Sequence, residues 1–96
     1  MRPILLLFTQ RGCSACAVAL PEFERYRTRN PMQMALVLDA DGPYEKHFMG
    51  KAIRSTPLYV LRSNGEEKGV THEGAMKAEQ LEKWVAGAVK AIGEAR

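Results

Sequence analysis

The stretch Ile4-Leu-Leu-Leu-Phe-Thr-Gln-Arg-Gly-Cys-Ser-Ala-Cys16 sets the organisation of the whole chain. Its five consecutive apolar residues, Ile4–Phe8, are typical of a short strand that is buried on both faces, as in parallel sheets. The polar segment Thr9–Gly12 is expected to form a loop, and residues 13–29 are predicted to form a helix with a kink at Pro21. The two cysteines of the chain therefore come where a buried strand ends and a helix begins.

Strands and helices alternate along the rest of the chain. The sequence pattern predicts strands over residues 34–38, 58–61 and 68–71, a short helix over 44–49 and a hairpin turn at 63–66. The last helix has the clearest apolar stripe, which we expect to pack in the core. This stripe consists of Leu81, Trp84, Val85, Ala88, Val89 and Ile92. The order βαβαββα indicates the α/β class.

Length and composition fit a single folded domain over residues 1–96. The chain is 46% hydrophobic and 26% charged, which favours a folded protein over a disordered one. The longest apolar run near the start, Ile4–Phe8, is too short for a membrane span or for a secretory signal. We therefore expect a cytoplasmic monomer that does not associate with membranes.

The basic residues do not form the dense patch expected of a nucleic-acid interface. The net charge is only +3, and the positive side chains are spread along the chain. The densest group is Arg25, Arg27 and Arg29, of which the first and last share a helix face. We expect a solvated helix end, whose cations interact favourably with the C-terminal end of the helix dipole, and no nucleic-acid partner.

The pair Cys13 and Cys16 indicates either redox chemistry or metal binding. A disulfide between them closes a very short loop and restricts the unfolded chain little, so a structural role explains the pair poorly. A zinc site would need four ligands, and His47 and His72 would have to complete the set. Because these histidines are far apart and lack zinc-finger spacing, we expect no metal and no other cofactor.

The start of a helix suits a reactive thiol. Unpaired backbone N–H groups and the helix dipole stabilise a thiolate there, and Arg11 adds positive charge, so we expect a lowered pKa for Cys13. Cys13 lies on the loop side, where a substrate can reach it, whereas Cys16 falls in the first helical turn and closer to the core. We therefore expect Cys13 to attack a disulfide as the nucleophile and Cys16 to resolve the mixed disulfide.

Several further segments resemble the thioredoxin superfamily, and they occur in the same order as in that family. The helix-kinking proline, the segment with the cis-proline, the hairpin turn and the start of the last helix all have counterparts. These counterparts are Pro21, Ile53–Val60, Asn64-Gly65-Glu66, Gly74-Ala75 and Gln80-Leu81.

The resemblance implies a thioredoxin-like fold, in which helices flank a central mixed four-stranded sheet. It implies a protein-disulfide reductase that takes part in electron transport and cell redox homeostasis. Its substrates would be protein disulfides, and its electron donor would be thioredoxin reductase or glutathione. It also implies that Thr56 and Pro57, joined by a cis peptide bond, bind the substrate backbone next to the cysteines, with Gly12 and Gly74 beside them.

The chain departs from thioredoxins in four places. The sequence begins at the strand leading to the cysteines, so we expect the usual first strand and helix to be missing. Gly12 replaces a tryptophan, Ser14-Ala15 replaces Gly-Pro, and Leu7 and Val37 stand where thioredoxins have a buried aspartate and a lysine. The short frame and the missing acid are closer to glutaredoxins. A glutathione-dependent reductase is therefore an alternative, as is a non-catalytic binding module with this fold.

The residues between the cysteines also predict the direction of the reaction. Strong oxidants of this superfamily owe their potential to a very stabilised thiolate, often helped by a histidine at this position. Ser14 and Ala15 bring neither a positive charge nor a rigid proline. We therefore expect a reductant rather than an oxidant.

Overall fold

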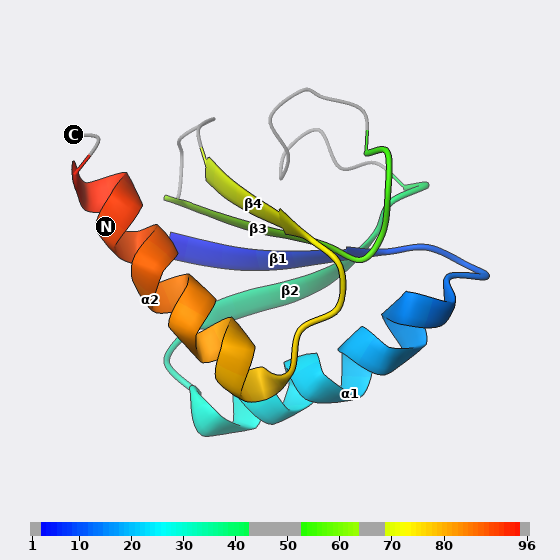
Figure 1. Ribbon diagram of the computed structural model, residues 1–96, viewed down its shortest axis with the longest axis horizontal. Helices are drawn as coiled ribbons and strands as arrows, with labels where there is room; N and C mark the ends of the chain where they lie inside the picture. Colours follow the sequence, from blue (N-terminus) through cyan, green and yellow to red (C-terminus); the bar gives the residue numbers. More distant parts are fainter. Residues whose placement is uncertain (1–2, 43–52, 64–68, 95–96) are drawn as a thin grey trace.

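The computed structural model describes residues 3–42, 53–63 and 69–94 of the 96-residue chain. Every strand and helix predicted within these ranges is confirmed, with bounds that differ by a few residues at most. The predicted helix over 44–49 and the turn residues 64–66 lie outside the described residues. The observed elements are β1 (Pro3–Thr9), α1 (Ser14–Arg29), β2 (Met34–Asp39), β3 (Leu58–Ser63), β4 (Gly69–Glu73) and α2 (Ala78–Glu94) (Figure 1).

The four strands form one mixed sheet in the order β2-β1-β3-β4, as the resemblance implied. β1 runs parallel to β2 and antiparallel to β3, and β4 runs antiparallel to β3. Because β1 has a neighbour on each side, it is central, and Leu5–Phe8 have no exposed surface. This central position explains why the strand is apolar throughout rather than at alternate residues.

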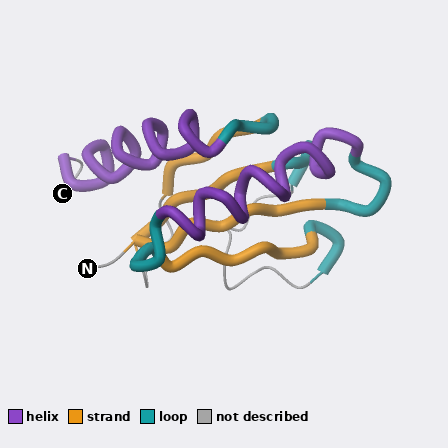
Figure 2. The backbone as a smooth tube through the Cα atoms, turned by 90° about the horizontal axis from the view of Figure 1, so that it is seen from below, coloured by secondary structure: helices purple, strands orange, loops and turns teal. Residues whose placement is uncertain are grey.

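Side chains of β1 alternate between two apolar clusters, one on each face of the sheet. Leu5 and Leu7 belong to a cluster that includes Phe23 of α1 and Leu81 of α2. Residues 4, 6 and 8 belong to a second cluster, with residues of β3, on the opposite face. Both described helices therefore cover the same face of the sheet, and Figure 2 shows them from below.

α1 begins after Cys13, its N-cap, and ends at Asn30. The backbone N–H and the side-chain amide of Asn30 both donate to the carbonyl oxygen of Tyr26 at 2.9 Å, which satisfies an otherwise unpaired acceptor of the last turn. Pro21 lies inside α1, and the helix continues through it. The residues that α1 buries have helical spacing: Cys16, Ala19, Phe23 and Tyr26.

The apolar stripe of α2 packs in the core at five of its six predicted positions. Val89 is the exception, because 42% of its surface is exposed. It lies at the edge of the stripe, where the helix surface turns away from the sheet. The prediction of a core position was therefore wrong for this residue. The other positions are buried (Leu81, Val85 and Ala88) or partly buried against the core (Trp84 and Ile92).

Ion pairs join the C-terminal half of α1 to the first turns of α2. Arg25 lies 3.4 Å from Glu79, and Arg29 lies 2.8 Å from Glu82. The side chains of Arg25 and Arg29 remain 51% and 45% exposed, which confirms the expectation of a solvated helix end, but their ion pairs with α2 were not predicted. Arg27 instead pairs within its own helix. Neither helix of the described residues is long and apolar enough to cross a membrane.

Candidate active site

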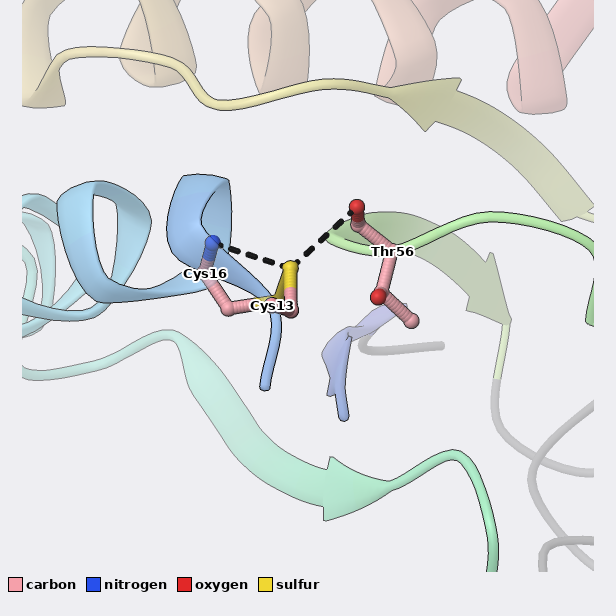
Figure 3. The surroundings of a disulfide bond; sticks show 3 residues. All are labelled: Cys13, Cys16 and Thr56. Atoms are coloured by element: carbon pink, nitrogen blue, oxygen red, sulfur yellow. Dashed lines mark hydrogen bonds between the residues drawn. A yellow bond between two sulfur atoms is a disulfide. The ribbon is translucent and has the colours of Figure 1, made fainter. Parts of the chain in front are cut away.

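The start of α1 holds the two cysteines in a disulfide bond. The sulfur atoms of Cys13 and Cys16 are bonded, and the two Cα atoms are 5.2 Å apart (Figure 3). Cys13 has an extended backbone (φ −86°, ψ 106°), and Gly12 before it has a φ of +80°. Glycine adopts this left-handed conformation without steric cost, so it lets the chain turn sharply from β1 into α1.

The two cysteines differ in accessibility, as expected from their places in the helix. Cys16 is 3% exposed and belongs to the buried face of α1, whereas Cys13 is partly exposed. Ser14 and Ala15 between them are exposed. An incoming disulfide can therefore approach Cys13 but not Cys16. The chemical roles of nucleophile and resolving cysteine stay predictions.

A backbone N–H group of the first helical turn points at the sulfur of Cys13. The N–H of Cys16 donates to Sγ of Cys13 at 3.1 Å. In the reduced protein the same donor would stabilise a negative charge on this sulfur, together with the positive end of the helix dipole. The first turn of α1 contains no acidic residue that would oppose such a charge. The local geometry thus favours the thiolate form of Cys13.

The segment before β3 lies against the disulfide, although it is far away in the sequence. Sγ of Cys13 is 3.4 Å from the carbonyl oxygen of Thr56 (Figure 3). A sulfur in a disulfide carries no proton, so this is a polar contact that can become a hydrogen bond once Cys13 is reduced and protonated. The Thr56–Pro57 peptide bond is cis, which confirms the prediction, and Pro57 is fully buried.

Gly74 lies next to Pro57, at the end of β4. It follows β4, has a φ of +98°, and its N–H donates to the carbonyl oxygen of Pro57 at 3.0 Å. A Cβ atom at Gly74 would meet nothing within 4 Å, so the surface beside it is open. The structure therefore brings Thr56 against Cys13, with Gly74 bonded to the neighbouring Pro57 and Gly12 directly before Cys13. Their roles in substrate binding stay predictions.

Two further positions bear on the charge around the disulfide. Arg11 is exposed in the turn before Gly12, and its effect on the Cys13 thiol stays a prediction. Leu7 and Val37 are direct partners across the parallel pair of β1 and β2. Leu7 is fully buried and belongs to the core cluster. An apolar pair therefore occupies the place where the resemblance would put a carboxylate and an ammonium group.

The alternative of a zinc site requires His47 and His72. His47 lies outside the described residues. The His72 ring packs against the rings of Tyr59 and Trp84, with a centroid distance of 6.0 Å to each. Within residues 3–42, 53–63 and 69–94, no three His, Cys, Asp or Glu side chains are grouped as metal ligands.

Two residues that the sequence patterns did not single out, Tyr59 and Glu22, bind the segment that follows Gly74. The hydroxyl of Tyr59 accepts a hydrogen bond from the N–H of Met76 at 3.2 Å. The carboxylate of Glu22 accepts one from the N–H of Ala78 at 3.0 Å. Tyr59 stands in an apolar strand and Glu22 on a charged helix, so neither residue gave a sequence signal for these contacts.

Comparison with solved structures identifies the fold. The periplasmic thioredoxin SoxS from Paracoccus pantotrophus, in its reduced form, matches with a TM-score of 0.73 and 24% identity, over 99% of this chain and 100% of its own. A thioredoxin from Fasciola hepatica matches with a TM-score of 0.71 and 21% identity, over 91% of this chain and 81% of its own. Chloroplastic thioredoxin z matches with a TM-score of 0.73 and 18% identity, over 93% and 80%. No family model and no curated protein sequence matches the chain.

The chain therefore has the thioredoxin fold, and the resemblance drawn from its sequence is confirmed at the level of the fold. The Cys13–Cys16 disulfide lies at the start of α1.

Proposed function

We propose that this protein is a thiol–disulfide oxidoreductase that reduces disulfide bonds of other proteins. One observation carries the proposal above the others. Cys13 is partly exposed, and its Sγ lies 3.1 Å from the backbone nitrogen of Cys16 and 3.4 Å from the carbonyl oxygen of Thr56. The N–H group can stabilise a thiolate at this sulfur, and the partial exposure lets a substrate disulfide reach it. An attacking cysteine needs both.

The reaction begins with the reduced protein. The Cys13 thiolate attacks one sulfur of the substrate disulfide, a new S–S bond forms, and the substrate's other sulfur leaves as a thiolate and takes up a proton. The Cys16 thiol then loses its proton and attacks the sulfur of Cys13. This step closes the Cys13–Cys16 disulfide and releases the second substrate thiol. The substrate gains two electrons and two protons: both electrons come from the two cysteines, one proton comes from the Cys16 thiol, and the other comes from solvent, which had received it when Cys13 ionised.

We place the substrate backbone along Thr56 and Pro57, beside Cys13. Gly12 and Gly74 leave room on either side, because a Cβ atom at each would meet nothing within 4 Å. The N–H of Gly74 is already bonded to the carbonyl of Pro57. Gly74 would therefore contribute open space rather than a hydrogen bond to the substrate.

We further propose that the protein works as a reductant in the cytoplasm. The helix start supports a moderately stabilised thiolate, which corresponds to a potential between about −180 and −270 mV. A pair in this range stays largely reduced in a cytosolic glutathione pool. The electron donor would be a thioredoxin reductase or glutathione.

Reduction of insulin tests the proposal. Wild-type protein should accelerate the precipitation of insulin chains in dithiothreitol, and turnover should be measured with glutathione and with thioredoxin reductase as alternative donors. Turnover only with glutathione would favour the glutaredoxin-type alternative. No acceleration in dithiothreitol would favour a non-catalytic binding module. Equilibration with defined glutathione ratios gives the potential, and a value near −120 mV would contradict both the direction and the cytoplasmic placement.

A further inference from the structure

The segment Gly74–Ala78 leads from β4 into the first residue of α2. Four of its backbone N–H groups form hydrogen bonds that hold it in place. Each of these groups donates to an acceptor at 2.9–3.2 Å. One acceptor is a backbone carbonyl, that of Pro57 for Gly74, and one is a side chain three residues along the chain, that of Gln80 for Lys77. The other two are side chains from distant elements, Tyr59 of β3 and Glu22 of α1.

Tyr59 provides a well-positioned acceptor because its ring is buried and closely packed. The side chain has no exposed surface, and its ring packs against the rings of Phe23, His72 and Trp84 at centroid distances of 6.0–6.4 Å. A phenylalanine would fill the same space. The hydroxyl is needed only for a polar partner, and that partner is the N–H of Met76. Tyr59 also follows Pro57 by two residues on the same chain segment.

Glu22 connects the same segment to the helix that carries the cysteines. One carboxylate oxygen accepts the N–H of Ala78 at 3.0 Å and also pairs with Arg25 at 2.7 Å. The bond from Ala78 and then the pairing with Arg25 lower the pKa of Glu22, so the carboxylate is ionised at neutral pH. It serves as a cap for α2 that is supplied by α1.

We infer that Tyr59 and Glu22 are positioning residues that hold the Gly74–Ala78 segment at a fixed distance from Cys13 and Pro57. This inference rests on the proposed function. The segment borders the place where a protein substrate would lie, and its two supports come from β3, which follows Pro57, and from α1, which begins at Cys13. A protein substrate has to fit between these elements, whereas a small disulfide needs only the sulfur of Cys13.

The experiment compares a protein substrate with a small one. Tyr59→Phe keeps the ring and removes the hydroxyl, and Glu22→Ala removes the carboxylate. Each should raise the KM for insulin about three- to tenfold, the effect of one lost hydrogen bond. The rate with a small aromatic disulfide that releases a coloured thiolate should stay unchanged. Glu22→Gln keeps an acceptor oxygen for Ala78 and should restore most of the insulin KM.

Matched controls separate positioning from general damage. Tyr26→Phe removes the hydroxyl of another buried tyrosine, on α1, and Glu24→Ala removes an exposed carboxylate that pairs only with Arg27 among the described residues. Neither should change the KM for insulin. Fluorescence of Trp84, the single tryptophan of the chain, reports whether each variant is folded.

The outcomes distinguish this inference from the proposed function. An unchanged insulin KM in Tyr59→Phe and Glu22→Ala would overturn the inference, as would equal losses with the insulin and the small disulfide. If the wild-type protein reduces neither substrate, the proposed function itself fails. Selective loss of insulin affinity, with rescue by Glu22→Gln, would support the positioning role.

Discussion

The two described helices begin in similar ways but use their first N–H groups differently. Each helix follows a glycine with positive φ, Gly12 at +80° and Gly74 at +98°. At α1 the acceptor is a sulfur atom, because the N–H of Cys16 donates to Cys13. At α2 the acceptors are oxygen atoms of other side chains, including Glu22 on the neighbouring helix.

The difference shows that the attraction of a helix N-terminus for negative charge can either stabilise the fold or remain available to a thiolate. A helix N-terminus attracts negative charge wherever it occurs. At α2 that attraction is satisfied by carboxylates, with Glu22 as a cap and Glu79 in the first turn, and it helps to fix the fold. The first turn of α1 has no acidic residue, so its attraction remains for the Cys13 thiolate. The helix start that carries the cysteines is thus the one without an acidic residue in its first turn.

Removing the cysteines should have the largest effect. Cys13→Ser should lower insulin reduction to the uncatalysed background, because no accessible nucleophile is left at the helix start. Cys16→Ser should instead accumulate mixed disulfides, since the attacking sulfur remains and the resolving one is lost. Gel analysis without reductant measures the trapped species. Trapping by Cys13→Ser at the same level would contradict the assigned roles.

Substituting the two glycines should destabilise both helix starts. Gly12→Ala and Gly74→Ala should each cost about 1–2 kcal/mol, because an L side chain is strained at positive φ even where space is open. Urea unfolding followed by Trp84 fluorescence measures this cost. If either variant kept wild-type stability, the positive φ at that glycine would not cost the free energy expected for an L side chain.

Placing an acid at the start of α1 should make it resemble α2. Ala15→Glu puts a carboxylate in the first turn, where it competes with the Cys13 thiolate for the same helix end. We expect alkylation of reduced Cys13 at mildly acidic pH to slow by roughly three- to tenfold, through repulsion between like charges. Ala15→Gln is the neutral control and should react at the wild-type rate. Equal rates for both variants would show that the free helix start does not matter for reactivity.

Protonation of Glu22 at acidic pH should lower the stability of the protein, because it weakens the hydrogen bond at the start of α2. The pKa of this carboxyl is lowered in the folded protein from its ordinary value of 4.5, first by the N–H of Ala78 and then by Arg25. A lowered pKa means that the stabilisation is complete above pH 4.5 and is lost as the pH falls through the folded value. Wild type should therefore lose slightly more stability than Glu22→Gln on acidification below pH 4.5. Parallel thermal melts over this range measure the difference, and identical pH profiles would contradict the capping role.

Local sequence patterns predicted the elements and the redox pair because both depend on neighbouring residues. The apolar run of β1, the stripe of α2 and the junction before Cys13 are all encoded within about one element's length. The accessible and buried positions of Cys13 and Cys16 follow from their places in the first helical turn. The cis bond at Pro57 was predicted only through the resemblance to thioredoxins, because base rates alone favour a trans bond.

Contacts between distant segments could not be predicted from such patterns. Glu22 and Ala78 are separated by 56 positions, and Tyr59 and Met76 by 17. A carboxylate on an amphipathic helix has the same local pattern whether it faces water or another helix. For this reason the pairing of Arg25 and Arg29 with α2 was also missed.

The sequence by itself determined which segments of this protein are strands and helices and that the cysteine pair lies at the start of a helix, because hydrophobic periodicity and helix ends are local properties. The strands β1 and β2 illustrate what it left open, since both are strongly apolar. β1 is central and buried, whereas β2 lies at the edge of the sheet and leaves Met34, Leu36 and Val37 exposed. Only the tertiary structure decided this difference, because burial depends on which segments pack on either side of a strand.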